Sequence, residues 1–289
     1  MKFWLGASFA DTDQFVDLAR AAEKCGFDTL TLSDHLFYAD FATPYPYSKS
    51  GKPRWTAETH WPDVWVTIGA MSAVTNTLRF APNVYIAPAR DLFTVAKQVS
   101  TAAVLSRDRV TFGVGVGWCA EEFAATGQDF HTRGRRLNEM IPALRDLWSG
   151  RNVTIDGLPE LSISPTPAEP IPVLVGGDSE AALRRAARLG DGWIGNRIYT
   201  EEQLDTVLDS LRQLLDEYGR TGPFEIIAPL AVLPDADTFR HFAAKGVTGT
   251  MAAPWWLATA EEKARYGEGS LELKVATMER FAQEVIAKM

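Results

Sequence analysis

The hydrophobic pattern of the chain alternates between two kinds of segment. Short, continuous apolar runs are each followed by stretches in which apolar residues recur every three or four positions. Continuous runs are typical of parallel strands that are buried on both faces, and the wider spacing is typical of amphipathic helices. Eight runs predict strands: 2–8, 27–33, 78–87, 109–116, 171–177, 192–195, 225–232 and 247–254.

At least one predicted helix follows every one of these runs, and parallel neighbours require such crossovers. Eight strand–helix units in 289 residues predict a (β/α)8 TIM barrel. The alternative is an open doubly wound sheet, but no glycine fingerprint follows the first strand, where a dinucleotide-binding sheet would carry it. Insertions at 36–60, 150–170 and 253–269 interrupt the pattern. The first and third follow strands, so we expect them at the carboxyl-terminal rim of the barrel.

Composition narrows the functional classes. The net charge of −8 and the sequence pI of about 5.1 argue against a nucleic-acid partner and against an anionic membrane surface. Cys25 and Cys119 are far apart and lack metal-ligand spacing, so we expect neither a disulfide framework nor a bound metal. No apolar run reaches the ~18 residues of a membrane span, and no leader pattern opens the chain. We therefore expect a soluble cytoplasmic protein.

The second predicted strand ends in a pair of polar residues, Asp34 and His35. Only four histidines are present, and His35 alone ends a predicted strand. A histidine beside a carboxylate at the catalytic rim is a candidate acid or base. The alternative is a capping aspartate beside a packed histidine.

The third and fourth strands carry unusual residues. Pro82 lies inside the third strand, where it removes a ladder donor and predicts a bulge. In the fourth strand Gly113, Gly115 and Gly117 occupy alternate positions, which face one side of a strand. That bare face leaves room for a flat ligand. Close packing against another element is the alternative.

The fifth strand ends in Gly176 and Gly177, and Ser179 follows at the expected N-cap of a helix. Glycines let backbone N–H groups approach a ligand, and a helix start attracts anions. This arrangement predicts a phosphate cradle; an ordinary tight turn with an N-cap is the alternative.

Three segments together resemble the bacterial luciferase-like oxidoreductases, and among these the branch that uses the deazaflavin coenzyme F-420. They are 33–35, 79–118 and 171–193, and the stretch 113–141 is especially similar to that branch. The resemblance implies one luciferase-like TIM-barrel domain over 1–289. It also implies hydride transfer between coenzyme F-420 and a small-molecule substrate, and a homodimer.

The resemblance also implies roles for particular residues. His35 is the expected catalytic residue, and the bond between Asn83 and Val84 is expected to be a non-prolyl cis peptide behind the cofactor ring. Together, the strand pattern and the resemblance give these candidate cofactor-binding residues: Asp34, His35, Asn83, Val84, Gly115, Gly117, Trp118, Gly176, Gly177, Asp178 and Ser179.

Trp118 departs from the related sugar-phosphate dehydrogenases, some of which have a glutamate there. This departure and the aromatic residues of the rim insertions favour a bulky apolar or aromatic substrate. Three alternatives stay open. The first is an FMN-dependent monooxygenase supplied by a separate reductase, and the second is a non-catalytic flavin- or deazaflavin-binding protein. The third is a sugar-phosphate aldolase or isomerase, for which the strand ends offer no lysine.

Overall fold

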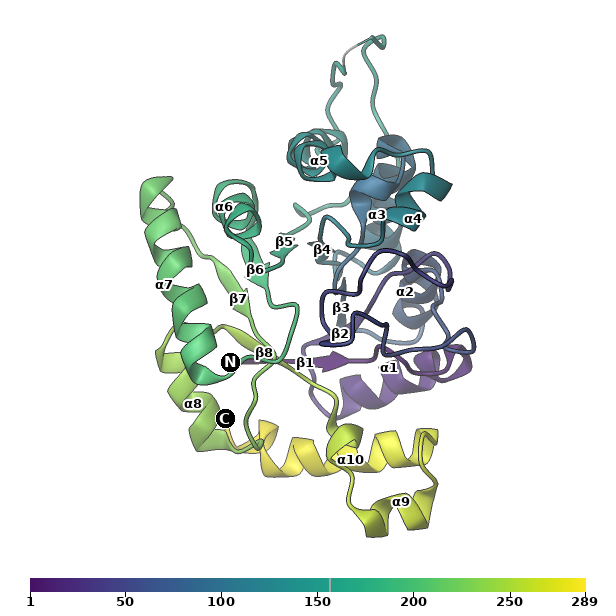
Figure 1. Cartoon of the computed structure of the whole chain (residues 1–289), viewed down its shortest axis with the longest axis vertical. Coiled ribbons are helices and arrows are strands. Elements are labelled where there is room, and N and C mark those ends of the chain that lie inside the picture. Colours follow the sequence, from purple (N-terminus) through teal and green to yellow (C-terminus); the bar gives the residue numbers. More distant parts are fainter. Residues whose placement is uncertain (156) are drawn as a thin grey trace.

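The computed structural model describes residues 1–155 and 157–289 and contains one sheet of eight parallel strands (Figure 1). The strands follow one another around the sheet in the order β3-β2-β1-β8-β7-β6-β5-β4, which is the order of a barrel opened between β3 and β4. Their bounds are β1 Lys2–Gly6, β2 Thr29–Leu32, β3 Arg79–Pro82, β4 Phe112–Val114, β5 Val173–Gly176, β6 Gly192–Ile194, β7 Glu225–Ile227 and β8 Gly249–Ala252. The predicted TIM barrel is confirmed.

A bulge interrupts the seam between β3 and β4. Isolated parallel bridges join Phe80 to Val110 and Tyr85 to Val114. Five steps separate the two residues on the β3 side and four separate those on the β4 side, so one extra residue is accommodated there. The structure has a cis peptide bond between Asn83 and Val84, as the resemblance implied. The bulge that Pro82 predicted is therefore present, immediately after β3.

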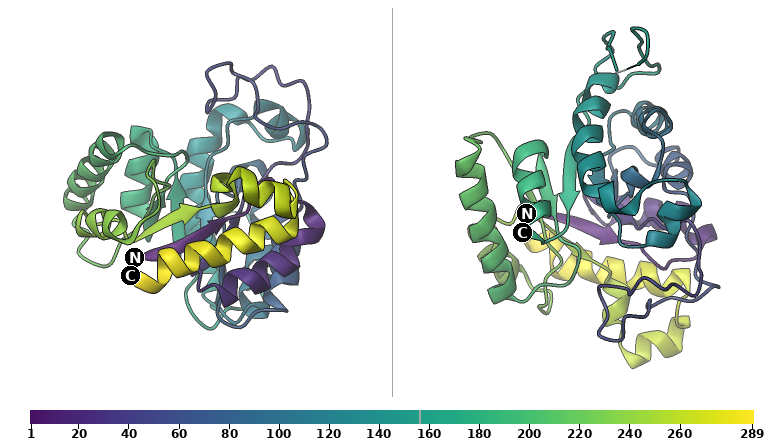
Figure 2. Two further views of the ribbon diagram at one scale, coloured as in Figure 1. Left: turned by 90° about the horizontal axis from the view of Figure 1, so that it is seen from below. Right: turned by 45° about the horizontal axis from the view of Figure 1, so that its top comes forward.

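Helices surround the barrel and cover its outer face (Figures 1 and 2). Buried apolar side chains of helices and strands form one continuous core between the two layers. The helices around the sheet are α1 Phe15–Lys24, α2 Val64–Ser72, α3 Leu92–Leu105, α4 Ala120–Ala125, α5 Arg133–Trp148, α6 Glu180–Leu189, α7 Glu201–Glu217, α8 Ala236–Ala244 and α10 Leu271–Glu284.

One further helix, α9 (Ala260–Tyr266), lies inside 253–269, which the sequence pattern represented only as a loop. Thr259 and Glu262 form a reciprocal capping box that starts it. None of its residues is buried, so it lacks the apolar stripe from which a helix is recognised in sequence.

A second, smaller apolar cluster fills the interior of the barrel. Trp4, Ala81, Leu174, Ile194 and Ile227 are buried there, and the partly buried Val84 and Met251 pack against them. The barrel is therefore a packed core rather than a pore, and a ligand can only bind above this floor, at the rim.

Residues 36–60, the insertion after β2, form a segment that we call the strap. It forms an irregular loop beside β2 and β3 in Figure 1, whereas the described residues of the second insertion, 150–155 and 157–170, extend away from the barrel beyond α5. Within the described part of the chain, no helix is both long and apolar enough to cross a membrane.

Candidate functional site

The strap crosses the carboxyl-terminal rim of the barrel. It leaves the end of β2, and its residue Tyr47 accepts a hydrogen bond at its hydroxyl from Asn196 Nδ2, at 3.2 Å. Asn196 follows β6, which lies four strands away from β2 around the sheet. At the far end of the strap, His60 Nδ1 accepts a hydrogen bond from the Thr12 backbone N–H, in the loop after β1. The strap is therefore held over the mouth of the barrel from several sides.

Two adjacent glutamates at the start of α4 anchor the near side of the strap. Glu121 Oε1 accepts hydrogen bonds from the backbone N–H groups of Ala42 (2.7 Å) and Thr43 (2.9 Å). Burial alone would raise the pKa of Glu121, but hydrogen bonds from Thr43, from its own backbone N–H and from the Cys119 thiol outweigh it and lower the pKa to about 2. Glu122 Oε1 accepts from the Leu36 N–H at 3.0 Å, where the strap begins.

His35 pairs with Glu122 beneath the strap. The distance between His35 Nδ1 and Glu122 Oε1 is 2.9 Å, and the exposed fractions of the two side chains are 10% and 4%. As a carboxylate, Glu122 can only accept, so the proton between the two groups lies on Nδ1. The second ring nitrogen, Nε2, is then the atom of His35 that remains available for proton exchange.

An aromatic cluster encloses the imidazole of His35. Its ring centre lies 4.7 Å from that of Trp55, 4.8 Å from that of Trp61 and 5.8 Å from that of Trp118. Tyr45 packs edge-on against both Trp55 and Trp118. The indole N–H groups of Trp55 and Trp61 are buried without a hydrogen-bond partner among the residues described. The surroundings of His35 are thus apolar, with two unused donors.

Asp34 is placed beside His35 but is fully engaged by the protein. One oxygen accepts from the Ile86 backbone N–H at 2.9 Å, and the other accepts from the Arg90 guanidinium at 2.7 Å. Burial raises the pKa of Asp34, against the opposing effect of Arg90. Asp34 therefore fixes the segment after the bulge. Its direct contact with a cofactor stays a prediction.

The alternate glycines of the β4 region accommodate the bulge rather than a flat ligand. A Cβ atom on Gly113 would lie 2.0 Å from the Pro82 carbonyl oxygen, and one on Gly115 would lie 2.4 Å from Val84 Cγ2. Gly176 of β5 faces Val84 in the same way, at 2.5 Å. The expectation of empty space at this face was wrong, because the bulge fills it. These glycines allow Val84 to reach the barrel interior, where it closes the floor of the rim site.

The loop between β5 and α6 has the geometry of an anion cradle. Gly177 has φ +109°, a conformation that only glycine adopts readily. Ser179 is the N-cap of α6 and accepts from the Ala182 N–H. Asp178 forms an ion pair of 2.8 Å with Arg197, in the segment after β6. The backbone here is bare and lies at a helix start, which suits a phosphate group.

Two nearby arginines carry charges without a carboxylate partner in the described chain. Arg133 donates to the carbonyl oxygens of Gly117 and Phe130, and Arg185 donates to Asn138 and to the Gly134 carbonyl. In a protein with net charge −8, such positive charges at the start of α5 and on α6 favour an anionic ligand. The residues present therefore fit a phosphate-bearing cofactor.

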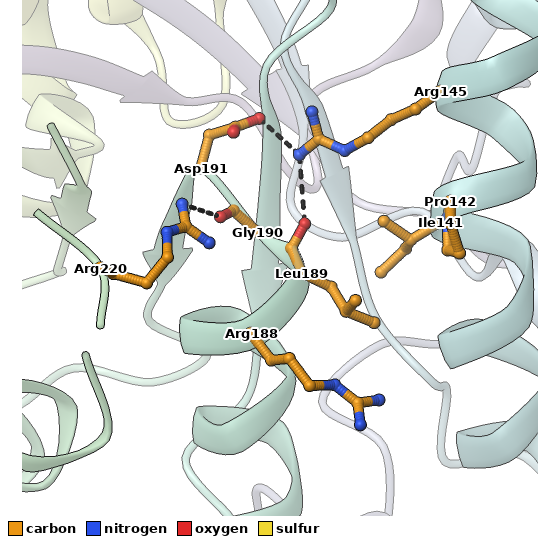
Figure 3. Close-up of a pocket in the computed structure, with 8 residues that line it drawn as sticks. All are labelled: Ile141, Pro142, Arg145, Arg188, Leu189, Gly190, Asp191 and Arg220. Carbon is orange, nitrogen blue, oxygen red and sulfur yellow. Dashed lines mark hydrogen bonds and ion pairs between the residues drawn. The ribbon is translucent and has the colours of Figure 1, made fainter. Parts of the chain in front are cut away.

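Two cavities open on the surface at opposite ends of the barrel. One, of about 250 Å³, lies at the rim between the loop after β1 and the segment 255–274. The other, of about 290 Å³, lies near the amino-terminal end of β6 and is drawn in Figure 3. There, Arg145 and Arg220 bind carbonyl oxygens at the end of α6, and Arg145 also pairs with Asp191. Those arginines therefore satisfy carbonyl oxygens at the carboxyl-terminal end of α6.

The sequence analysis did not identify Glu122, which directly follows Glu121, as the partner of His35. The two residues are adjacent, and only the direction of α4 decides which one faces His35. Neither cysteine extends the site: both are free and buried, and burial raises the pKa of Cys119 to about 12. No group of side chains in the described chain is arranged to hold a metal ion.

Comparison with known proteins identifies the family of the chain. The sequence model of the luciferase-like monooxygenase family matches residues 4–270. The chain therefore belongs to the luciferase-like monooxygenase family. The class of enzyme that the resemblance implied is confirmed at this level.

Individual relatives are similar along most of the chain. An uncharacterized protein of Mycobacterium tuberculosis is 33% identical over 297 residues, which cover 100% of both chains. An F420-dependent glucose-6-phosphate dehydrogenase of Beutenbergia cavernae is 31% identical over 257 residues, 84% of this chain and 69% of the relative. The solved structure of the monooxygenase RslO1 from Streptomyces bottropensis has a TM-score of 0.68 at 17% identity, covering 100% of this chain and 99% of that one. This last likeness concerns the fold.

Proposed function

We propose that the protein is an oxidoreductase that transfers a hydride between coenzyme F-420 and a bulky apolar or aromatic organic substrate. The observation that carries the proposal is the rim site itself. The glycine-containing loop that ends in Ser179, the N-cap of α6, fits a phosphate group. His35, paired with Glu122, lies within a cluster of tryptophans under the strap. The 31% identical relative named as an F420-dependent dehydrogenase supports the choice of cofactor.

Different residues of the rim bind the cofactor and exchange the proton. Gly177 and Ser179 present the bare loop and the start of α6 to the cofactor phosphate, and Val84 forms the floor under its ring. Trp55, Trp61 and Trp118 exclude water from His35, whose Nε2 exchanges the proton that accompanies oxidation or reduction of the substrate. Coenzyme F-420 supplies, when bound, the hydride chemistry itself.

The aromatic surroundings argue against a sugar phosphate as substrate. Trp118 lies 5.8 Å from the ring of His35 and adds an apolar surface beside it. No second carboxylate besides Glu122 is hydrogen-bonded to His35 in the described chain. An apolar substrate with one oxidisable or reducible polar group matches this environment.

A titration against both cofactors tests the proposal. Purified protein is titrated with coenzyme F-420 and, separately, with FMN, and binding is followed through the fluorescence of each cofactor. We expect micromolar or tighter affinity for coenzyme F-420 and weaker affinity for FMN. Tighter binding of FMN would assign the chain to the flavin-dependent monooxygenases instead.

Two arginines near the start of α5 provide a matched pair of variants. Arg133→Met should weaken cofactor binding, because it removes a guanidinium that has no carboxylate partner in the described chain. Arg135→Met is the control on the same helix, since Arg135 is exposed and faces Glu139 at 3.8 Å. Equal affinities for the two variants would contradict a role for this charge in binding the cofactor.

A further inference from the structure

The rim cavity contains a buried lysine that the site described above does not use. Lys274 lies on α10, is 5% exposed and lines the cavity of about 250 Å³. Its ammonium donates to Gln14 Oε1 and to the Gly269 carbonyl oxygen, both at 2.6 Å. No carboxylate lies within ion-pair distance of it in the described chain. A buried charge with only neutral partners is unusual, because its desolvation is poorly compensated.

The hydrogen bonds of Lys274 leave one donor unused. An ammonium has three N–H groups, and the described chain supplies two acceptors to it, Gln14 Oε1 and the Gly269 carbonyl oxygen. Gln14 cannot rearrange freely to supply another, since its amide nitrogen is within hydrogen-bond distance of Asp11 Oδ2 (3.3 Å) and of the Gly269 carbonyl oxygen (3.4 Å). Burial lowers the pKa of Lys274, against the opposing effect of Asp11 and Asp13. A ligand oxygen in the cavity would satisfy the third N–H.

The rest of the cavity wall is mainly apolar. Phe9, Trp255, Trp256 and Leu273 contribute aromatic and aliphatic surface. The other charged residues of the wall, Lys263 and Glu268, form an ion pair with each other at 2.7 Å. Lys274 is therefore the single unpaired charge of this wall. The remaining lining residues are Ser8 and Gly269.

Phe9, on the wall of the cavity, also packs against the aromatic cluster around His35. The ring of Phe9 lies 5.4 Å from that of Trp61, which in turn lies 4.8 Å from that of His35. Phe9 has φ +68°, a strained conformation for a residue with a side chain, and such strain concentrates at functional sites. On the other side, the hydroxyl of Ser8 is 2.7 Å from that of Ser33, directly before Asp34 and His35.

We propose that this cavity is a subsite for the carboxylate of an aromatic or alicyclic organic acid, held by Lys274, with the apolar part of the molecule directed past Phe9 toward the tryptophans around His35. One free N–H and one unpaired positive charge match a carboxylate better than a phosphate dianion. The volume suits a ring and a short side chain, and is at the small end of ligand sites. That this acid is the substrate rests on the proposed function; the binding site itself does not.

Calorimetric titration with phenylacetate and its neutral analogue phenylacetamide tests the subsite. The protein is titrated with each compound, both with and without coenzyme F-420. We expect phenylacetate to bind about tenfold or more tightly than phenylacetamide, because only the carboxylate forms an ion pair with the ammonium, whereas the amide carbonyl accepts as a neutral group. Equal affinities, or no binding of phenylacetate, would overturn the proposal.

Variants on the cavity wall assign the preference to Lys274. Lys274→Met should abolish the discrimination between acid and amide, and Lys274→Arg should retain most of it. Lys263→Met is the matched control, since that lysine already has a partner, and it should keep the preference. An unchanged preference in a folded Lys274→Met protein would sink the assignment.

A second substitution leaves Lys274 in place. Trp256 is 57% exposed at the edge of the cavity, so Trp256→Glu should fold and should repel phenylacetate while leaving the binding of phenylacetamide almost unaffected.

Cofactor affinity is measured on the same samples. If the wild-type protein prefers phenylacetate over phenylacetamide but does not bind coenzyme F-420, only the proposed function is refuted. Normal cofactor binding without an acid preference would refute the subsite alone.

Discussion

Glu122 accepts hydrogen bonds from two consecutive residues, the imidazole of His35 and the backbone N–H of Leu36, through the same oxygen atom. The carboxylate therefore fixes the rotamer and the protonated nitrogen of His35 while it also fixes the first residue of the strap. One side chain of α4 thus couples the orientation of the candidate catalytic group to the position of the segment that covers it.

This coupling predicts the behaviour of Glu122→Gln. The amide can still accept from Leu36, but it can also present N–H₂ to the imidazole, which would move the ring proton to Nε2. We expect turnover to fall by roughly 10²-fold or more with little change in cofactor affinity. The measurement is kcat and cofactor Kd on the same preparation.

His35→Ala is the companion variant and should lower turnover by roughly 10²–10⁴-fold if the imidazole exchanges a proton. A double variant with Glu122→Gln should then be no slower than His35→Ala alone, because the glutamate acts through the histidine. Additive losses would mean that Glu122 has a separate role. If His35→Ala lowered only cofactor affinity, the histidine would merely orient the ring.

The order of strands and helices was predictable because each strand of the barrel is buried on both faces and reads as a continuous apolar run. The turn at Gly177 and the cap at Ser179 were also visible, because positive φ and N-capping select particular residue types locally. These features depend on neighbouring residues alone.

The partners within the site were not predictable in the same way. The contact of Glu122 with His35 spans 87 positions, and that of Lys274 with Gln14 spans 260. Nothing in the local pattern distinguishes Glu121 from Glu122, since both are acidic residues in the first turn of one short helix. The space beside the alternate glycines was misinterpreted for a related reason. Pro82 and Val84, which fill this space, belong to a different strand segment, so the local pattern around the glycines does not reveal them.

A stability prediction concerns Glu23. Its Oε1 accepts from the backbone N–H groups of Asn76, Thr77 and Leu78, which lead into β3. Burial alone would raise the pKa of Glu23, but these donors lower it to about 2. We expect Glu23→Ala to lose about 2 kcal/mol of unfolding free energy at pH 7, because it leaves these donors unsatisfied.

The pH dependence of that loss follows from the sign of the shift. The folded pKa lies below the ordinary value of 4.5, so the ionised carboxylate stabilises the fold fully above about pH 4.5, and this stabilisation is lost as pH falls toward 2. Urea unfolding at pH 7, 4 and 3 should show the gap in unfolding free energy between wild type and Glu23→Ala becoming smaller as the pH falls. Glu169→Gln, at an exposed position, is the control and should show no such gap.

The anchoring of the strap by Glu121 gives a dynamic prediction. Glu121→Ala removes the acceptor for the Ala42 and Thr43 N–H groups, so hydrogen–deuterium exchange should become faster across 36–60 while the barrel strands keep their protection. Release of coenzyme F-420 should also become faster, because the strap lies over the mouth. Unchanged exchange in 36–60 would show that the aromatic contacts hold the strap without this anchor.

The packing of the bulge gives the last prediction. A methyl group on Gly115 would lie 2.4 Å from Val84 Cγ2, so Gly115→Ala must displace Val84 from the barrel floor. Overpacking of this kind costs about 1–3 kcal/mol of unfolding free energy, and the displaced floor should weaken cofactor binding as well. Gly69→Ala is the control, because nothing lies within 4 Å of the methyl group that it adds to α2. Alanine also favours a helix more than glycine does. We expect a higher melting temperature for Gly69→Ala and a lower one for Gly115→Ala. Full cofactor affinity in Gly115→Ala would show that the ring does not bear on Val84.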